Sequence, residues 1–163
     1  ILGTATEGHV ALVLGGPGTH LGQSALLAEV FNRTEGDAPP VILEDERANG
    51  EFILQHRDWI SACTDISDGG LAMAAFELAI QGDIGVTLDT DNTQELFGED
   101  QARYLIAASF DQAEALMTAA AASGITLTTV GKFTGSDVTF GGSSLSLDDL
   151  KSAYQSCFDT HFG

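Results

Sequence analysis

The segment TDISDGGLAMAAFELA, from Thr64 to Ala79, joins a polar turn containing two glycines to an almost wholly apolar stretch. Between Leu71 and Ile80 only Glu77 is charged. A helix that is hydrophobic on nearly every side is typically buried. We therefore expect a helix from Gly69 to about Gln81, with its N-terminus in the interior or at an interface.

Buried amide groups at such a helix start need hydrogen-bond acceptors. Asp68 or Ser67 can supply one as the N-cap residue. Gly69 and Gly70 leave the first turn without side chains, so another group can approach the backbone closely. The same residues therefore suit either a structural cap or a cradle for an anion, and their spacing favours the cap.

A second motif is the glycine-rich segment LGGPGTHLGQS, from Leu14 to Ser24, between a predicted strand and a predicted helix. Phosphate-binding loops have this order, because backbone amides and a helix start then meet the anion. The segment matches neither the dinucleotide-binding nor the P-loop pattern, and it lacks the P-loop lysine. A tight turn with Ser24 near the helix start is the simpler interpretation. His20 is either a hydrogen-bonded loop residue or a ligand.

The third motif is a pair of adjacent carboxylates, Glu99 and Asp100, just ahead of a buried strand. Such a pair can bind Mg²⁺ or accept hydrogen bonds from a sugar or an amide. The alternative is a solvated turn, in which Arg103 neutralises one of the charges.

The composition limits the ligands and partners. The chain has 163 residues, with 24 acidic and 6 basic side chains and a net charge of −18. This length suits a single domain. The charge repels nucleic acid and anionic membranes, so we expect neither as a partner. A bound phosphate would need backbone amides, a helix N-terminus or a divalent metal. The cysteines, Cys63 and Cys157, belong to no metal-binding pattern and are expected to be reduced core thiols, although their pairing stays open.

Apolar runs and helical segments alternate along the chain, which predicts an α/β (α+β) sandwich with a mixed β-sheet and helices packed on one face. Strands are expected within residues 9–16, 61–67, 85–91, 103–110 and 125–133, with 135–142 as a hairpin partner of the last. Helices are expected at residues 25–34, 44–59, 69–81, 111–123 and 148–158. Asp111 is the predicted N-cap of the fourth helix, with Glu114 as its N3 partner, and Gly124 is its predicted stop.

Taken together and in order, the segments LG-x-x-x-x-HLGQS, ERANGEF, ACTDISDGGLAMAAFELA, LFGEDQARYLI and VGKFTG resemble the C-terminal part of phosphoribosylformylglycinamidine synthase. The resemblance covers nearly the whole chain, from about residue 10 to about residue 160. DxSDGGL alone is shared across the AIR synthase-related superfamily, which includes aminoimidazole ribonucleotide synthetase and thiamine-monophosphate kinase. The combination with LGQS and FGEDQxRY is more specific to the synthase.

This resemblance implies an AIR synthase C-terminal-domain-like fold. It also implies that residues 1–163 form one domain at the C-terminal end of a longer multidomain chain. The parent enzyme would be a cytoplasmic, ATP-dependent C–N ligase of purine biosynthesis that uses Mg²⁺ and converts formylglycinamide ribonucleotide to formylglycinamidine ribonucleotide. Its partners would be the N-terminal domains of the same chain, a glutaminase subunit that supplies ammonia and a small accessory subunit. We expect the isolated domain to be inactive and to bind neither ATP nor Mg²⁺ tightly.

The resemblance and the motifs point to candidate substrate or phosphate contacts but to no catalytic residue and no metal ligand. The candidates are Ser67, Asp68, Gly69, Gly70, Gly22, Ser24, Glu99, Asp100 and Gln101. Relatives usually have His where this chain has Thr64, and Glu where it has Gly16 or Pro17. These departures favour an alternative, a degenerate structural or interaction module of the enzyme. The corresponding domain of a sister enzyme such as aminoimidazole ribonucleotide synthetase is a further alternative.

Overall fold

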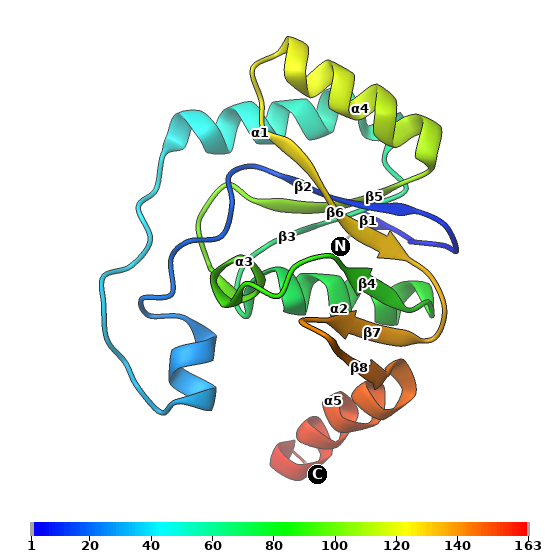
Figure 1. Ribbon diagram of the computed structural model, residues 1–163. Helices are drawn as coiled ribbons and strands as arrows, with labels where there is room; N and C mark the ends of the chain where they lie inside the picture. The colour runs from blue at the N-terminus through cyan, green and yellow to red at the C-terminus, as the bar shows by residue number, and fades with distance from the viewer. Residues whose placement is uncertain (1, 163) are drawn as a thin grey trace.

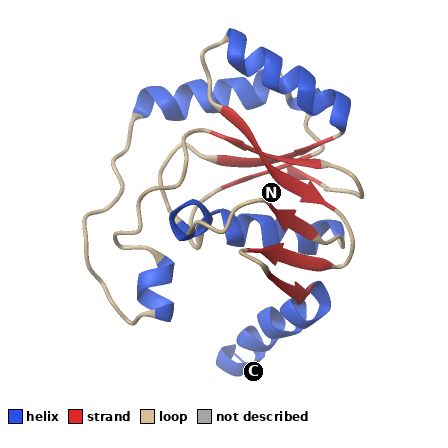
Figure 2. Ribbon diagram, viewed as in Figure 1, coloured by secondary structure: helices blue, strands red, loops and turns tan. Residues whose placement is uncertain are grey.

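The computed structural model describes the backbone of residues 2–162 and the side chains of residues 2–156. An eight-stranded sheet with the order β1-β3-β5-β2-β6-β4-β7-β8 forms its centre (Figure 1, Figure 2). The strands are β1 (Leu2–Gly3), β2 (Val10–Leu14), β3 (Ala62–Asp65), β4 (Val86–Leu88), β5 (Tyr104–Ala108), β6 (Leu127–Phe133), β7 (Asp137–Phe140) and β8 (Ser143–Ser146). The helices are α1 (Leu43–Gln55), α2 (Gly70–Gly82), α3 (Thr93–Phe97), α4 (Phe110–Ala122) and α5 (Leu147–Phe162), with a short π-type helix η1 (Leu26–Val30) and a 3₁₀ turn η2 (Arg57–Trp59).

The sheet is mixed, as predicted. Within residues 2–162 the paired strands are antiparallel except for β4 and β7, which run parallel. The α+β class and the mixed sheet expected from the sequence are therefore confirmed. No helix in this part of the chain combines the length and the apolar character needed to cross a bilayer.

The central strands β2 and β5 are buried on both faces, because their side chains alternate between two separate apolar clusters. The set that packs with α2 is Ala11, Val13, Leu105 and Ala107. The set that packs with α1 and α4 is Leu12, Leu14, Ile106 and Ala108. Figure 1 shows α1 and α4 together on one side of these strands and α2 on the other.

The expectation of helices on one face only is therefore wrong. The runs VALVL and YLIAA contain almost no polar residue, whereas a strand with one solvated face alternates apolar and polar side chains. An almost wholly apolar run of this kind is therefore the sequence pattern that indicates a strand with helices packed on both faces.

The strand β7 is not the hairpin partner of β6, which corrects a second expectation. β4 lies between them: Leu88 pairs with Gly131 of β6, and Val86 pairs in parallel with Val138 of β7. β7 instead forms a hairpin with β8, through Gly141 and Gly142, which both have positive φ. A short turn after a strand does not reveal that an earlier strand inserts beside it.

The helix positions agree with the sequence better than the predicted caps do. α4 begins at Phe110 with Ser109 at the N-cap, so Asp111 lies in the first turn and is not the cap. Its predicted end is confirmed, since Ser123 closes the helix and Gly124 follows with φ +69°. The helix expected at 44–59 divides into α1 and η2, and the one expected at 25–34 is reduced to η1.

Candidate functional site

The three motifs of the sequence meet at one end of the sheet. The glycine-rich loop follows β2, the DISDGG turn leads from β3 into α2, and the turn containing Glu99 and Asp100 leads from α3 towards β5. The side chains of this last turn bond to both of the other segments. We call residues 98–103 the clamp turn.

Glu99 caps two helix starts with one oxygen atom. Its Oε1 accepts hydrogen bonds from the amides of Gly69 and Ala25, both at 2.8 Å. Gly69 is the N-cap of α2, and Ala25 is the N-cap of η1. A carboxylate at a helix N-terminus is stabilised by the amide groups and by the helix dipole.

The N-cap predicted for α2 from Ser67 or Asp68 is therefore wrong. Both side chains are exposed, and the helix start has no side-chain cap from its own segment. The turn enters the helix through Gly69 and Gly70, with φ values of +81° and +66°. In this geometry the Gly70 amide donates to the backbone carbonyl of Ser67, 2.9 Å away, and the Gly69 amide donates to Glu99.

Asp100 holds the glycine-rich loop in the same way. Its Oδ2 accepts hydrogen bonds from the amides of Thr19 at 2.7 Å and His20 at 2.9 Å, and its Oδ1 accepts one from the Thr19 hydroxyl at 2.8 Å. Burial raises the pKa of Asp100, but these hydrogen bonds and the charge of Arg103 together outweigh it and lower the pKa below its ordinary value. Asp100 is therefore a carboxylate at neutral pH.

The buried side chain of Arg103 binds both the glycine-rich loop and the clamp turn. Only 4% of its surface is exposed, and its guanidinium donates to the backbone carbonyls of Gly16 at 3.1 Å and Gly98 at 2.9 Å. Burial lowers its pKa, while the charges of Asp100 and Glu95 oppose that shift. Among the described side chains Arg103 forms no ion pair within 4.0 Å, so its expected role as a direct partner of a neighbouring acid is replaced by carbonyl binding.

The clamp turn is itself held by α1, a connection that sequence reasoning missed. Ala102 has φ +57°, a left-handed conformation that is unfavourable for a residue with a Cβ. Its amide donates to Glu46 Oε1 at 2.9 Å, and its carbonyl accepts from Asn49 Nδ2 at 2.8 Å. Both partners belong to the ERANGEF segment, so the co-occurrence of that segment with FGEDQ was the available signal.

The predicted site residues fall into two groups. The first group is structural in this conformation. Hydrogen bonds of Gly69, Glu99 and Asp100 join the segments, whereas those of Gly70 and Ser24 close turns within their own segments. Ser24, only 1% exposed, donates to the Leu21 carbonyl at 2.7 Å, and Gly22 lies half-buried against the Asp37 backbone. The second group is exposed to solvent and consists of Ser67, Asp68 and Gln101.

A polar cleft and a mostly apolar cleft flank the clamp turn. A cleft of about 260 Å³ on one side is lined by Glu46, Asp65, Ser67, Gln101 and Tyr104. A cleft of about 390 Å³ on the other side is lined by the glycine-rich loop and by apolar side chains such as Leu71, with Asp89, Thr90 and Glu95 as its acidic and hydroxyl groups. Carboxylate, amide and hydroxyl groups suit a ligand that offers hydrogen-bond donors. Among the described residues, no group of three or more His, Cys, Asp or Glu side chains is arranged to hold a metal ion.

The sequence and the fold identify the family. Residues 6–142 match the model of the AIR synthase related protein, C-terminal domain. The chain belongs to this family. It is 62% identical over 152 residues to the phosphoribosylformylglycinamidine synthase subunit PurL of Roseobacter denitrificans, covering 93% of this chain and 21% of the relative. It is 58% identical over 162 residues to the PurL subunit of a Jannaschia species, covering 99% of this chain and 22% of the relative.

This AIR synthase-related domain therefore spans about a fifth of the length of these curated relatives. Among solved structures it resembles Thermotoga maritima PurL complexed with FGAR, with a TM-score of 0.75 and 17% identity over 91% of this chain and 28% of that chain. It also resembles thiamine-monophosphate kinase from Stenotrophomonas maltophilia, with a TM-score of 0.58 and 21% identity over 84% of this chain and 51% of that chain. These likenesses confirm the predicted AIR synthase C-terminal-domain-like fold.

Proposed function

We propose that this chain is the C-terminal domain of a cytoplasmic, ATP-dependent phosphoribosylformylglycinamidine synthase. The parent enzyme would convert formylglycinamide ribonucleotide to formylglycinamidine ribonucleotide in purine biosynthesis, with ATP, Mg²⁺ and ammonia. The observation that carries the proposal is 62% identity to a PurL subunit over 93% of this chain. The relatives reported above are subunits of the synthase, which favours it over a sister enzyme such as aminoimidazole ribonucleotide synthetase.

The domain's own contribution would be a wall of the substrate site and not the chemistry. We assign it no catalytic residue and no metal ligand. The Glu99 and Asp100 carboxylates already accept hydrogen bonds from four backbone amides and one hydroxyl group, so these carboxylates do not fit the suggested role of binding Mg²⁺. ATP and Mg²⁺ would therefore be bound by the N-terminal domains of the parent chain.

Three exposed residues are the best remaining candidates for contact with substrate or phosphate. Ser67 and Gln101 line the same cleft of about 260 Å³, and Asp68 follows in the exposed DISDGG turn. Gly69, Gly70, Gly22, Ser24, Glu99 and Asp100 would position this face. A phosphate could reach the Gly69 amide only by displacing Glu99, because that amide is already satisfied.

The partners would be the N-terminal domains of the same chain, a glutaminase subunit and a small accessory subunit. A likeness to the structure of PurLQS from Thermotoga maritima, with a TM-score of 0.66 and 16% identity, supports a domain that functions inside an assembly. The relatives are roughly five times longer than the matched segment, which supports the same conclusion.

The test is an assay of the full-length parent chain with its glutaminase and accessory subunits. ATP hydrolysis that depends on formylglycinamide ribonucleotide is expected, and its absence would refute the proposed activity. Asp68→Asn, Ser67→Ala and Gln101→Ala are each expected to lower kcat/KM by about tenfold with an unchanged Tm, since one lost substrate hydrogen bond is worth about 1.4 kcal/mol. Asp111→Asn, an exposed carboxylate on α4, is the matched control.

A second candidate is a structural half that only supports the catalytic domains. It is favoured by one observation: the amides that would cradle a phosphate are occupied by the protein's own carboxylates. If all three surface variants kept normal turnover and normal affinity for both substrates, this second candidate would replace the substrate-wall role.

A further inference from the structure

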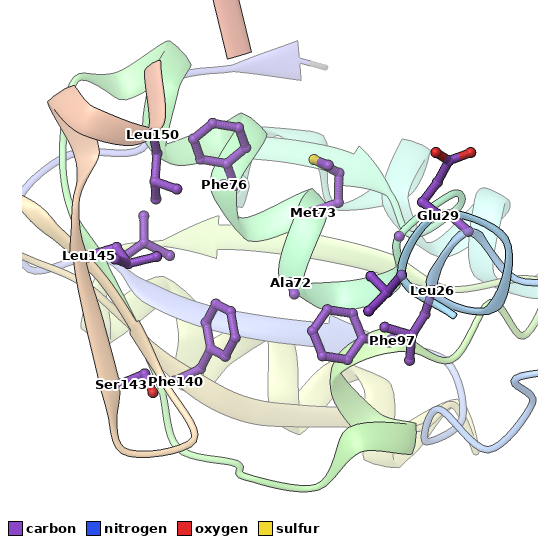
Figure 3. A pocket seen from close by; sticks show the side chains of 14 residues that line it. Leu26, Glu29, Ala72, Met73, Phe76, Phe97, Phe140, Ser143, Leu145 and Leu150 are labelled. Carbon is purple, nitrogen blue, oxygen red and sulfur yellow. The ribbon is translucent and has the colours of Figure 1, made fainter. Parts of the chain in front are cut away.

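An apolar groove runs beside the clamp turn on the α2 side of the sheet. Its volume is about 310 Å³, and η1, α2, α3, β7, β8 and α5 contribute to it. Figure 3 shows Leu26 and Phe97 at one end of the groove and Leu145 and Leu150 at the other, with Met73 and Phe76 of α2 along one wall. Of its lining residues, all within the described part of the chain, Glu29 alone is charged.

The groove is open, and large apolar side chains border it without cover. Leu145 is 58% exposed, Val30 67% and Met73 38%. A contiguous apolar surface of this kind on a soluble domain marks an interaction site or a ligand groove. The groove also shares two residues with the site, because Gly69 and Ala25 line it and Glu99 bonds to both.

Charge and chain length decide between the occupants of the groove. A second copy of the chain carries the same net charge of −18, so two copies repel each other as whole molecules. A segment of the same polypeptide is held nearby by the chain, and its effective concentration compensates for a modest contact area. Such a segment exists if the proposed function is correct, since the chain covers only 21% of a PurL relative.

We infer that this groove is the docking site for an apolar segment carried by another domain of the same parent chain. The inference rests on the proposed function only for the existence of that longer chain. The segment places apolar side chains between α2 and the β7–β8 hairpin, and it contacts the η1–α2 junction that Glu99 joins. A basic side chain at its edge faces Glu29, which is the charge complement that the groove offers.

The chain provides its own probe for this contact, because it contains only two methionines. Met73 lies in the groove and is 38% exposed, and Met117 lies on α4, on the other face of the sheet, and is 40% exposed. Their similar exposure in the domain predicts similar oxidation by peroxide unless something covers one of them, and the hydrogen bond from the Thr129 hydroxyl to Met117 Sδ at 3.7 Å would slow Met117 and not Met73.

The experiment oxidises the full-length parent chain with peroxide and follows both methionine peptides by mass spectrometry. Met73 is expected to react about fivefold more slowly than Met117, and both are expected to react at one rate after denaturation. Leu145→Glu, a change at the exposed edge of the groove, should bring the Met73 rate up to the Met117 rate. Leu54→Glu, at the exposed Leu54 side chain of α1, is the matched control and should change neither rate, although Leu54 is the more exposed of the two leucines (72% against 58%).

Met73 reacting as fast as Met117 in the native parent chain would overturn the inference. Protection that survives Leu145→Glu, or that disappears on dilution to a monomer, would also overturn it, the latter in favour of a second copy. Substrate-dependent ATP hydrolysis is measured on the same sample. Normal hydrolysis with an unprotected Met73 rejects the groove alone, whereas a protected Met73 without hydrolysis rejects the proposed function alone.

Discussion

At the residue scale, the clamp turn shows how two neighbouring acids can be fixed by backbone amides. Glu99 and Asp100 sit half-buried, and their carboxylates accept hydrogen bonds from four amides in two distant segments. Hydrogen bonds to an ionised acceptor are stronger than neutral ones, and an unpaired amide at a buried helix start is costly. These two side chains therefore join the glycine-rich loop and the DISDGG turn through hydrogen bonds to their backbone amides.

Asp100→Asn is expected to destabilise the protein at pH 7 by about 1–2 kcal/mol, because a charged acceptor of three hydrogen bonds is lost. The pKa of Asp100 is lowered in the folded state, so its contribution is complete above its ordinary pKa of 3.8 and is lost as the pH falls through the lowered value. Urea unfolding at several pH values measures the difference, which should shrink below pH 4. A difference that stays constant down to about pH 2 would contradict this assignment.

Cys63 gives a second prediction at this scale. It is free, as expected, only 6% exposed, and burial raises its pKa to about 11. The side chain of Cys157 lies outside the described part of the structure, so a Cys157→Ser variant isolates Cys63. Iodoacetamide at about pH 8 should leave the native variant unlabelled and label it fully in denaturant, because the thiolate is the nucleophile. Rapid labelling of the native variant would show that Cys63 is accessible.

At the element scale, α2 is a helix whose entry depends on glycine and on a distant cap. A Cβ on Gly70 would lie 2.7 Å from the Leu96 carbonyl oxygen, and the residue has φ +66°. Gly50, in α1, is the opposite case, since an added Cβ would meet no atom within 4 Å. The two positions form a natural pair, one where glycine is required and one where it weakens a helix.

Gly70→Ala should lower the free energy of unfolding by about 1–3 kcal/mol or more, because the new Cβ meets backbone in a left-handed conformation. Gly50→Ala should raise it by about 0.5–1 kcal/mol, because alanine has the higher helix propensity. Chemical denaturation of both variants beside the parent protein measures the two shifts. Equal effects of the same sign would refute the assigned geometry at α2.

At the scale of the whole molecule, the acidic charge is nearly unopposed. The net charge is −18. Among the described side chains, the basic partners in ion pairs are Arg33, Arg47, Arg57 and Lys151, and most of these pairs are exposed. Exposed pairs add little stability, and a large net charge destabilises a compact state by self-repulsion.

Raising NaCl from about 20 mM to about 0.5 M should therefore increase the Tm, because salt screens the repulsion. Scanning calorimetry at a series of salt concentrations measures the effect. Lys132→Glu, at an exposed position of β6, should lower the Tm at low salt and much less at high salt. A Tm that does not depend on salt would mean that the acidic groups are too far apart to repel one another.

Features that depend on neighbouring residues were predictable from the amino-acid sequence. Continuous apolar runs placed β2 and β5, and the charge-poor stretch after Gly70 placed α2 as a buried helix. The glycines at the two turns marked where the backbone takes unusual conformations, and the co-occurrence of the motifs indicated the family. These signals are local, because hydrophobic period and backbone preference act over a few residues.

Contacts between residues that are far apart in the chain became visible only in the folded protein. Glu99 accepts hydrogen bonds from Ala25, 74 residues away in the chain, and from Gly69, 30 residues away. The amides of the α2 start are therefore bound by this distant carboxylate, and neither a cap from the DISDGG segment nor an open anion site is present there. β4 lies between β6 and β7, and the helices α1 and α4 cover the face of the sheet opposite α2. No local pattern specifies these choices, because a hydrogen-bond acceptor or an apolar face can be matched by any compatible segment, and the folded chain selects the set that satisfies all of them together.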